Sequence, residues 1–401
     1  MNIWTDYKRI PLPDLLSFIV DNRGKTVPTA DDGNHVLIAT NCIRNENLYP
    51  SYEKVRLLSE ETYQNWFRAH PVPGDIIFVC KGTPGRTCMV PDPIDFCIAQ
   101  DMIALRSNPA LIYNRFLLVV LRSRSIQEQI TNTSVGDVIP HFKKQFLNQL
   151  LIPVPPMEVQ RKIGDLYFTL VLKEELNKRI NDNLEQQAAA YFYHQFIVNA
   201  DPSWKEGTIS DLGTVIGGST PSKSKPEYYT DNGIAWITPK DLSVDKSKFI
   251  SHGADDITEL GLRNSSASIM PEGTVLFSSR APIGYIAIAD GEVTTNQGFK
   301  SVVPNSNVGT AFVYYFLKNV LPTIENMASG STFKEISGSA MRTVPAKIPD
   351  DERLQDFSDF CNPLFQQQRT LEAENRTLAA LRDSLLPKLM SGELDVSELD
   401  L

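Results

Sequence analysis

Hydrophobic residues follow two different patterns along the chain. Two segments of about 150 residues carry short apolar runs, broken by Gly, Pro and Thr, that are typical of short β-strands. The runs are HVLIAT (35–40), DIIFVC (75–80), GIAWIT (233–238), TVLFSS (274–279) and GYIAIA (284–289). Longer apolar stretches at 112–123 and 308–319 predict one helix in each segment. The pattern therefore predicts two mixed α+β domains.

A proline-rich hinge follows each segment, at 152–160 and 344–355, and leads into roughly 40 residues with almost no Gly or Pro. Proline ends a preceding helix but suits a first turn, so each hinge predicts the start of a long helix of about 60 Å. Pro363 and Pro387 are expected to kink or end the second helix. Apolar stripes run along both helices: Val159, Ile163, Leu166, Leu170, Leu172, Leu176, Ile180 and Leu184 in the first, and Leu354, Phe357, Cys361, Leu364, Leu371, Leu378, Leu385 and Leu389, interrupted by Gln368 and Asn375, in the second.

A helix this long cannot bury its stripe within one small domain. We therefore expect the two helices to pack antiparallel as a coiled-coil-like spacer. The alternative is two independent core helices.

The chain also repeats itself. Placing Gly74 on Gly273, 199 residues later, matches Phe78 with Phe277 and Lys81 with Arg280 without a gap. The offset then falls to 197 at Gln100 and Gln297, 196 at Phe116 and Phe312, and 195 at Gln160 and Gln355. A period this long indicates a duplicated domain pair rather than a solenoid. The expected fold is α+β with a pseudo-two-fold relation and four regions: 1–155, 156–200, 201–348 and 349–401.

Charge alone neither supports nor excludes a nucleic-acid partner. The 401 residues carry 39 Lys and Arg against 48 Asp and Glu, a net charge of −9. Residues 349–401 account for −7 of this net charge, so the two large segments are nearly neutral and can still carry local basic faces.

No apolar run approaches the roughly 20 residues of a membrane span. The first residues lack a signal-peptide pattern, so a cytoplasmic protein is expected.

Five strings carry a family resemblance: GGSTPSKSKPEYYTDNGIAWITPKDLS (217–243), GTVLFSSRAPIGYIAI (273–288), TNQGFKSV (295–302), ASGSTFKEIS (328–337) and LRDSLLPKLMSGELDVSEL (381–399). Together they resemble the specificity subunit of Type I DNA restriction-modification systems, over essentially the whole chain. The first domain departs from the pattern, with GTPGR for RAPIGY and CIAQDM for TNQGF.

The resemblance implies that each α+β domain recognises one half of a bipartite target in double-stranded DNA. It also implies that the helices set the gap, and that two methyltransferase subunits dock on the helical regions. The acidic C-terminal region, 350–400, is expected to contribute to that dock. S-adenosylmethionine for adenine-N6 methylation, and ATP for cleavage by restriction subunits, would bind partner subunits. This chain is then expected to hold no cofactor.

Motifs of enzymes that act on nucleic acids are missing from the sequence. It contains no [ND]PP[YF] tetrapeptide, no GxxxxGK[ST] loop and no HxE with a distal CxxC. Five cysteines without CxxC spacing, and five scattered histidines, argue against a metal site. We expect a non-catalytic adaptor. The alternatives are an enzyme with its own nuclease or methyltransferase activity, and a coiled-coil scaffold that binds only protein.

Cations on loops suit phosphates, and side-chain amides suit base edges. HFKK at 141–144 is interpreted as the counterpart of Phe333 and Lys334. Each candidate has a structural alternative, such as a solvated turn, a charged surface loop or a turn cap. The DNA-binding candidates are Lys81, Thr83, Arg86, Gln100, His141, Lys143 and Lys144 in the first domain, and Thr220, Lys223, Lys225, Lys240, Arg280, Asn296, Gln297 and Lys334 in the second.

Overall fold

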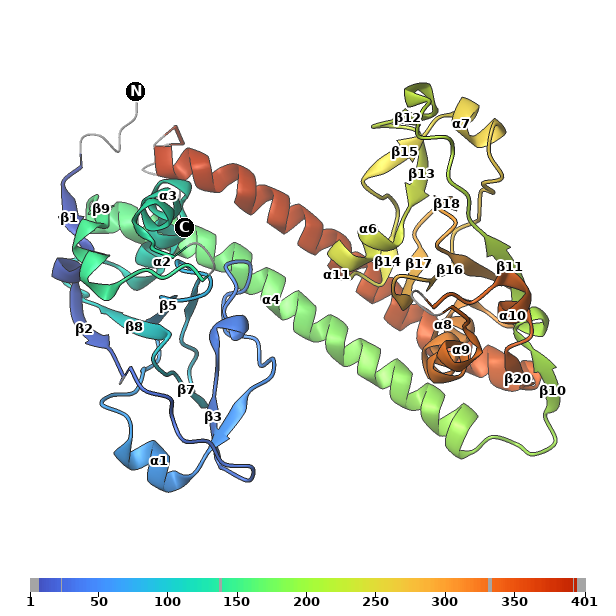
Figure 1. Cartoon of the computed structure of the whole chain (residues 1–401), viewed down its shortest axis with the longest axis horizontal. Coiled ribbons are helices and arrows are strands. Elements are labelled where there is room, and N and C mark those ends of the chain that lie inside the picture. The colour runs from blue at the N-terminus through green and yellow to red at the C-terminus, as the bar shows by residue number, and fades with distance from the viewer. Residues whose placement is uncertain (1–6, 23, 137–138, 331–333, 392, 395–401) are drawn as a thin grey trace. The chain divides into compact units, whose positions relative to one another are not determined.

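The computed structural model describes residues 7–22, 24–136, 139–330, 334–391 and 393–394 (Figure 1). The chain forms two compact units, residues 1–177 with 374–401, and residues 178–373. Each unit thus combines one α+β domain with half of each long helix. The two units are described separately below.

Unit 1 is built on three sheets. Strand β1 (Arg9–Pro11) pairs with β9 (Leu151–Pro153). A four-stranded sheet has the order β2 (Leu16–Val20), β8 (Met102–Ser107), β5 (Ile76–Val79) and β6 (Thr87–Met89). A three-stranded sheet has the order β4 (Arg56–Leu58), β3 (His35–Leu37) and β7 (Phe96–Cys97), with β3 and β7 parallel. Helices α1 (Glu60–Asn65), α2 (Asn114–Arg122) and α3 (Arg124–Thr133) complete the domain.

Unit 2 repeats these three sheets. Strand β10 (Lys205–Thr208) pairs with β20 (Pro345–Ile348). The central sheet runs β11 (Gly213–Gly217), β19 (Lys300–Pro304), β16 (Val275–Ser279), β17 (Ile283–Ala289) and β14 (Phe249–Ile250). The third runs β12 (Tyr229–Thr230), β15 (Asp255–Ile257), β13 (Ile234–Ile237) and β18 (Thr294–Thr295), with β13 and β18 parallel. Short helices α5 (Ile209–Leu212), α6 (Pro239–Val244), α7 (Glu259–Arg263), α9 (Leu321–Met327) and α10 (Gly338–Arg342) accompany α8 (Thr310–Asn319).

The duplication extends to individual hydrogen bonds. Gly74 and Gly273 both have positive φ, 85° and 82°, which glycine tolerates without steric cost. The Asn114 side-chain amide donates to the Gly74 carbonyl at 3.1 Å, and the Thr310 hydroxyl donates to the Gly273 carbonyl at 2.8 Å. The predicted strands and the two predicted domain helices, α2 and α8, are confirmed, and so is the repeat.

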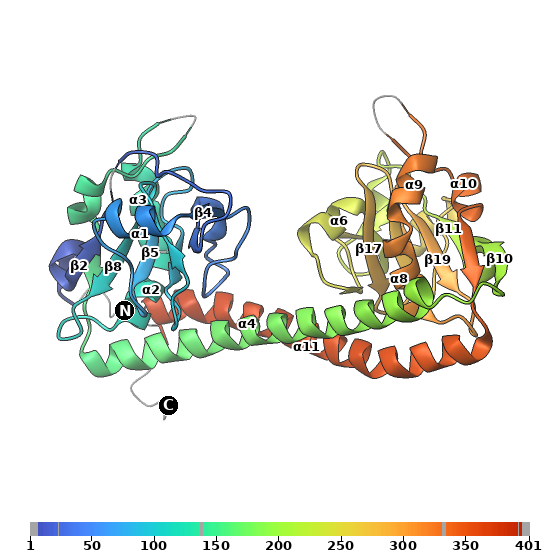
Figure 2. The same ribbon diagram turned by 90° about the horizontal axis from the view of Figure 1, so that it is seen from below.

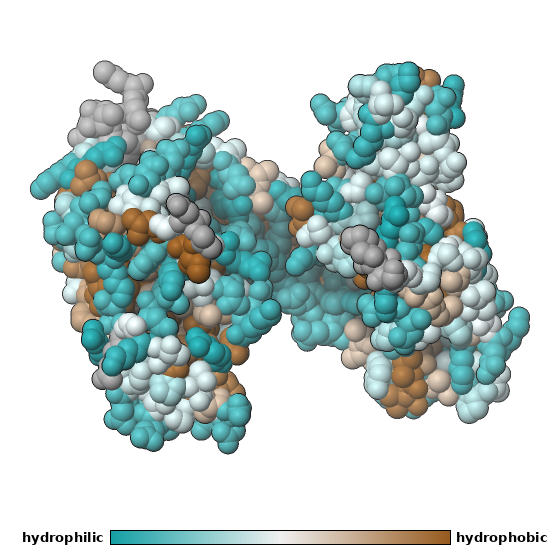
Figure 3. Space-filling view, viewed as in Figure 1, coloured by the Kyte–Doolittle hydropathy of each residue, from teal (hydrophilic) through white to brown (hydrophobic). Residues whose placement is uncertain are grey.

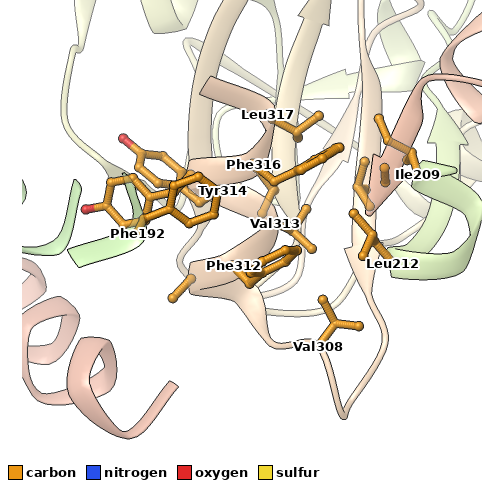
Figure 4. Packing of buried hydrophobic residues seen from close by; sticks show 14 of the residues in the cluster. Phe192, Ile209, Leu212, Val308, Phe312, Val313, Tyr314, Phe316 and Leu317 are labelled. Atoms are coloured by element: carbon orange, nitrogen blue, oxygen red, sulfur yellow. The ribbon is translucent and has the colours of Figure 1, made fainter. Parts of the chain in front are cut away.

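A buried helix lies at the centre of each domain. In unit 2, α8 carries Phe312, Val313, Phe316 and Leu317, all in the core (Figure 4). Phe192 lies on one side of this helix, and Ile209 and Leu212 of α5 lie on the other (Figure 4). Figure 2 shows α8 between the strands β17 and β19 and the last part of helix α4. Because α8 is enclosed on several sides, its apolar residues form a continuous run rather than a narrow stripe.

The two long helices form as predicted and pack antiparallel. Helix α4 spans Met157–Tyr193 and α11 spans Asp351–Ser391. In unit 1, Asn177 of α4 donates to Asn375 of α11 at 2.9 Å, and Glu174 of α4 pairs with Arg382 of α11 at 3.1 Å. In unit 2, the Gln368 side chain of α11 donates to the Asn181 carbonyl of α4 at 3.1 Å. The residue number rises along one helix while it falls along the other.

The buried faces of the two helices share one spacing of three, four, four and three residues. These faces consist of Gln160, Ile163, Tyr167, Val171 and Glu174 in α4, and Leu354, Phe357, Cys361, Phe365 and Gln368 in α11. A repeat of three, four and four residues averages about 3.7 residues per turn, close to that of a straight α-helix. Because hydrogen bonds join α4 to α11 in each unit, the alternative of two independent core helices is wrong.

Two details of the helix prediction are also wrong. Helix α11 ends at neither Pro363 nor Pro387, and both prolines are exposed, whereas a kink at either proline stays a prediction. On the exposed side of a helix, a missing N–H leaves a carbonyl that water can satisfy. Leu176 and Ile180, assigned to the buried stripe, are 45% and 41% exposed, because the register change near residue 171 moves the buried face onto Glu174 and Asn177.

Candidate nucleic-acid interface

The turn after β5 brings three of the candidate residues in unit 1 together. Gly82 and Gly85 have φ of 87° and 89°, and the Val79 amide donates to the Arg86 carbonyl at 2.9 Å. The tight turn spans residues 80–86 and contains Lys81, Thr83 and Arg86. Lys81 is exposed at the surface.

A second segment, 139–144, lies against this turn. The backbone of His141 pairs with Lys81, and the Phe142 amide donates to the Cys80 carbonyl at 2.8 Å. The Phe142 ring is fully buried and anchors the segment in the core. Lys143 is exposed, and the Lys144 ammonium forms an ion pair with Asp21 at the end of β2.

Gln100 belongs to the same corner. The Cys80 amide donates to the Asp101 carbonyl at 2.9 Å, which places the 98–101 segment beside the turn. The Gln100 side-chain oxygen is buried and, within the part of the chain that the structure describes, has no hydrogen-bond partner. Unit 1 thus gathers all seven of its candidate residues around the end of β5.

Unit 2 builds the same corner with different side chains. Arg280, which follows β16, pairs through its backbone with Glu335, and the Ile336 amide donates to the Ser279 carbonyl at 3.1 Å. Its Nη1 lies 3.4 Å from Glu335 Oε2. Gly284, in the place of Gly85, has φ of 96°.

The structure corrects one expected equivalence. By the backbone contacts, Phe142 corresponds to Ile336 rather than to Phe333, and His141 corresponds to Glu335. The buried apolar anchor sets this register, because Ile336 takes the place of the Phe142 ring in the core. Lys334 is exposed beside Glu335, and Phe333 lies outside the described residues.

The two amide candidates of unit 2 lie on the turn after β18. Asn296 caps this turn, because its Oδ1 accepts from the Gly298 amide at 2.8 Å. The alternative of a turn cap therefore describes Asn296. Gln297 is exposed, and its side-chain oxygen accepts a hydrogen bond from the Thr220 hydroxyl. Since the Ser279 amide donates to the Gly298 carbonyl at 2.7 Å, this turn adjoins the Arg280 corner.

The remaining three lysine candidates of unit 2 lie at different distances from this turn. Lys240 is exposed in the first turn of α6. Its neighbour Pro239 lies close to the turn, since a Cβ added to Gly298 would be 3.0 Å from Pro239 Cγ. Lys223 and Lys225 are exposed on the loop that continues from Thr220, and the Lys225 ammonium lies 3.7 Å from a Glu227 oxygen. Among the residues that the structure describes, these two lysines form no hydrogen bond or ion pair with the Arg280 corner.

Sequence reasoning missed two charged residues of the unit 2 corner, Lys300 and Glu335. The Lys300 ammonium lies 3.6 Å from Glu335 Oε1 and donates to the carbonyls of Gln297 and Phe299, each at 3.3 Å. Lys300 immediately follows the NQGF turn, and this position is the signal that would have marked it.

The corner is equipped to bind an anion and to read hydrogen-bonding groups. Arginine and lysine contact phosphates and fix position, whereas an exposed amide can bond a base edge. On the face drawn in Figure 3, hydrophilic side chains cover most of each unit and hydrophobic ones occur in small groups. Among the described residues, no three His, Cys, Asp or Glu side chains cluster as metal ligands, and no helix has the length and apolarity of a membrane span.

Comparison with known proteins places both halves of the chain in one family. The family model for the Type I restriction modification DNA specificity domain matches residues 6–186 and again 202–379. The MjaIX specificity subunit of a Type I restriction enzyme from Methanocaldococcus jannaschii is 42% identical over 154 residues, 38% of this chain and 35% of that protein. The chain thus spans about a third of that relative's length.

Two other relatives are matched over most of their length. The HindI specificity subunit from Haemophilus influenzae is 24% identical, covering 80% of this chain and 86% of that protein. The crystal structure of a Type-I restriction-modification system S subunit from M. genitalium is 17% identical, with a TM-score of 0.63 over 96% of both chains. The fold is therefore the fold of that structure.

Proposed function

Because the chain belongs to the family of the Type I restriction modification DNA specificity domain, with one match in each half, we propose how its parts divide the work of a specificity subunit. Each α+β domain, at 1–155 and 201–348, reads one half of a bipartite target in double-stranded DNA. The helical regions, 156–200 and 349–401, set the gap between the halves. The chain itself contributes recognition and no chemistry, and it acts in the cytoplasm.

The observation that carries this proposal is a corner built twice with the same backbone pairing and different side chains. Lys81 paired with His141 in unit 1 becomes Arg280 paired with Glu335 in unit 2. A shared backbone supports a shared mode of approach to the duplex, and the different side chains supply different sequence preferences. We propose that the candidate residues at each corner contact DNA there, and that Lys223 and Lys225 contact DNA from their own loop.

The helices are proposed to dock two methyltransferase subunits. Leu176 and Ile180 of α4 and Leu381 of α11 are between 41% and 45% exposed on otherwise polar helices. Leu176 and Ile180 lie four residues apart on α4, where side chains are neighbours, so together they offer a partner one apolar contact. S-adenosylmethionine and the chemistry of adenine-N6 methylation belong to that partner, and ATP-driven cleavage belongs to restriction subunits that join the complex.

The test is to express the chain with the methyltransferase subunit of its own system in a host without adenine-N6 methylation, and to sequence the methylated sites. We expect one asymmetric motif in two parts with a fixed gap. Gln297→Ala should relax base preference in one half only, with about 1–3 kcal/mol of discrimination lost. Gln367→Ala, at an exposed position of α11, is the matched control.

The alternatives give different results. An isolated chain that methylates or cuts DNA would be an enzyme in its own right. A complex that shows no sequence preference in gel shifts at any salt concentration would identify a protein scaffold. Relaxation of both half-sequences by Gln297→Ala would contradict the assignment of one half to each domain.

A further inference from the structure

One carboxylate at the unit 2 corner is shared by two cations. Glu335 Oε2 lies 3.4 Å from the Arg280 guanidinium, and Oε1 lies 3.6 Å from the Lys300 ammonium. Lys300 comes from the start of β19, Arg280 follows β16, and Glu335 belongs to the segment before α10. Three elements that are distant in sequence therefore meet at this one charge.

Both ion pairs are long, and the carboxylate that they share is partly exposed. Charge-assisted hydrogen bonds between nitrogen and oxygen are usually about 2.7–2.9 Å long. The side chains of Arg280 and Glu335 are 38% and 37% exposed, so water can compete for both of them. Contacts of this kind contribute little to stability. The Glu335 carboxylate is therefore positioned beside the two cations by weak ion pairs, which another anion can replace.

The Lys300 ammonium stays in place by other means. Its side chain is only 15% exposed, and it donates to the carbonyls of Gln297 and Phe299 and to the Ser279 hydroxyl. These partners belong to the two turns that form the corner, so they would hold the ammonium whether or not Glu335 is beside it. An anion that displaced Glu335 would find two cations already positioned.

We propose that Glu335 occupies the place of a DNA backbone phosphate in the free chain, and that it acts as a specificity-determining residue. This inference rests on the proposed function, DNA recognition by unit 2. A phosphate must displace the carboxylate before it can reach Arg280 and Lys300. Glu335 thereby weakens the phosphate contacts that every duplex offers, and the base contacts of the correct sequence decide which duplex is held.

The local charges support this role. Arg280, Lys300 and Lys334 carry three positive charges against the single negative charge of Glu335. Removing the carboxylate charge would leave all three cations available to any duplex. Phosphate contacts carry no sequence information, so stronger phosphate binding raises non-specific affinity and lowers the ratio of target to random binding.

Unit 1 handles the same position differently. His141 replaces Glu335, and the carboxylate there is Asp21, which pairs with Lys144 rather than with Lys81. In the described part of the chain, the exposed Lys81 ammonium forms no ion pair. The inference is therefore confined to unit 2.

The test compares Glu335→Gln with the unchanged chain, each assembled with its methyltransferase subunits. Binding to a random-sequence 40-base-pair duplex, and to the target duplex, is measured over a series of KCl concentrations. We expect Glu335→Gln to bind the random duplex more tightly, and the slope of log K against log salt to steepen by up to about 0.9, the value of one phosphate contact. The ratio of target to random affinity should fall.

Glu206→Gln is the matched control, because it removes one negative charge from an exposed position of β10 in the same unit. An unchanged slope in Glu335→Gln, or an equal change in Glu206→Gln, would overturn the inference. If the unchanged complex itself fails to bind its target, the proposed function fails instead. The two failures are thus distinguishable.

A second variant guards against a folding defect. The Glu335 backbone pairs with Ser329 at 2.9 and 3.0 Å independently of its side chain, so thermal melting of Glu335→Gln should match that of the unchanged chain. If the melting curves differ, Lys300→Met is used to test the inference instead. This variant should flatten the salt slope by about 0.9, and an unaltered slope would overturn the inference.

Discussion

At the scale of single residues, Arg122 is a charge held inside unit 1 by neutral oxygens. Its side chain is 8% exposed, and Nη2 donates to the carbonyls of Asn47 and Thr87, each at 2.7 Å. Nη1 donates to the Tyr167 hydroxyl at 3.2 Å. The planar fork of a guanidinium reaches these separate acceptors at once, and a lysine ammonium cannot. Arg122 therefore joins α2, β6 and α4.

Replacing Arg122 tests this role. Arg122→Lys should lower the free energy of unfolding of unit 1 by about 2–3 kcal/mol, because at least one buried carbonyl loses its charged donor. Hydrogen exchange followed by mass spectrometry can report unit 1 and unit 2 peptides separately. Arg124→Lys is the control, since Arg124 is 93% exposed and its pair with Glu128 should contribute less than about 1 kcal/mol. Equal losses in the two variants would contradict the prediction.

At the scale of elements, a buried polar network joins α4, α8 and α11 in unit 2. Glu185 of α4 forms an ion pair with Lys248, and accepts from the Tyr315 hydroxyl at 2.8 Å and from the Lys318 ammonium at 2.5 Å. Lys248 also donates to Gln368 of α11 at 2.7 Å. Burial pushes the pKa of Glu185 up, but the attraction and hydrogen bonds of the two lysines outweigh it and hold the pKa below its ordinary 4.5.

This shift predicts how the stability of unit 2 depends on pH. A carboxyl with a lowered pKa in the folded state stabilises it fully above its unfolded pKa, near 4.5, and loses that contribution as the pH falls toward the folded value. Glu185→Gln should destabilise unit 2 by about 3 kcal/mol at pH 7, because Lys248 is left buried without its anion. The difference from the unchanged chain should shrink below pH 4.5.

Urea unfolding of unit 2 between pH 7 and pH 3, followed by hydrogen exchange, measures both effects. Glu352→Gln, at an exposed position of α11, provides a control of the same chemistry. A constant difference between Glu185→Gln and the unchanged chain over this pH range would show that Glu185 does not titrate as described.

At the scale of the whole molecule, both long helices continue from one unit into the other. Helix α4 runs through Asn177 and Lys178, and α11 runs through Ala373 and Glu374, where the two units divide. An α-helix rises about 1.5 Å per residue, so a change in helix length changes a distance in a calculable way. This is the physical basis of the proposed gap.

Deleting residues 178–184 of α4 together with 366–372 of α11 tests whether the length of the helices sets the gap. Seven residues amount to one step of three and one of four, so the shortened helices keep their buried faces together. The loss of about 10 Å should shorten the gap in the methylated motif by about three base pairs, with both half-sequences unchanged. Deleting the residues from one helix only should abolish methylation, and an unaltered gap in the double deletion would refute the gap proposal.

The sequence predicted the elements well where the signal was local. The runs around Phe78 and Phe277 form buried strands, and the stretches around Phe116 and Phe312 form buried helices. The hydrophobic period of a strand or a helix can be read from residues that are close in the sequence. The repeat was visible for the same reason. The helix end expected at Pro363 is wrong, because the cost of proline depends on which side of the helix faces solvent.

By itself, the sequence determined two α+β domains of one pattern, two long helices and a turn with a cation at the end of one strand in each domain. Only the tertiary structure decided which charges meet. Glu335 joins Arg280 and Lys300, and Asp21 joins Lys144, across long separations in the chain. Hydrophobic period and turn chemistry act between near neighbours, whereas the pairing of charges depends on how distant segments pack, so no local pattern records it.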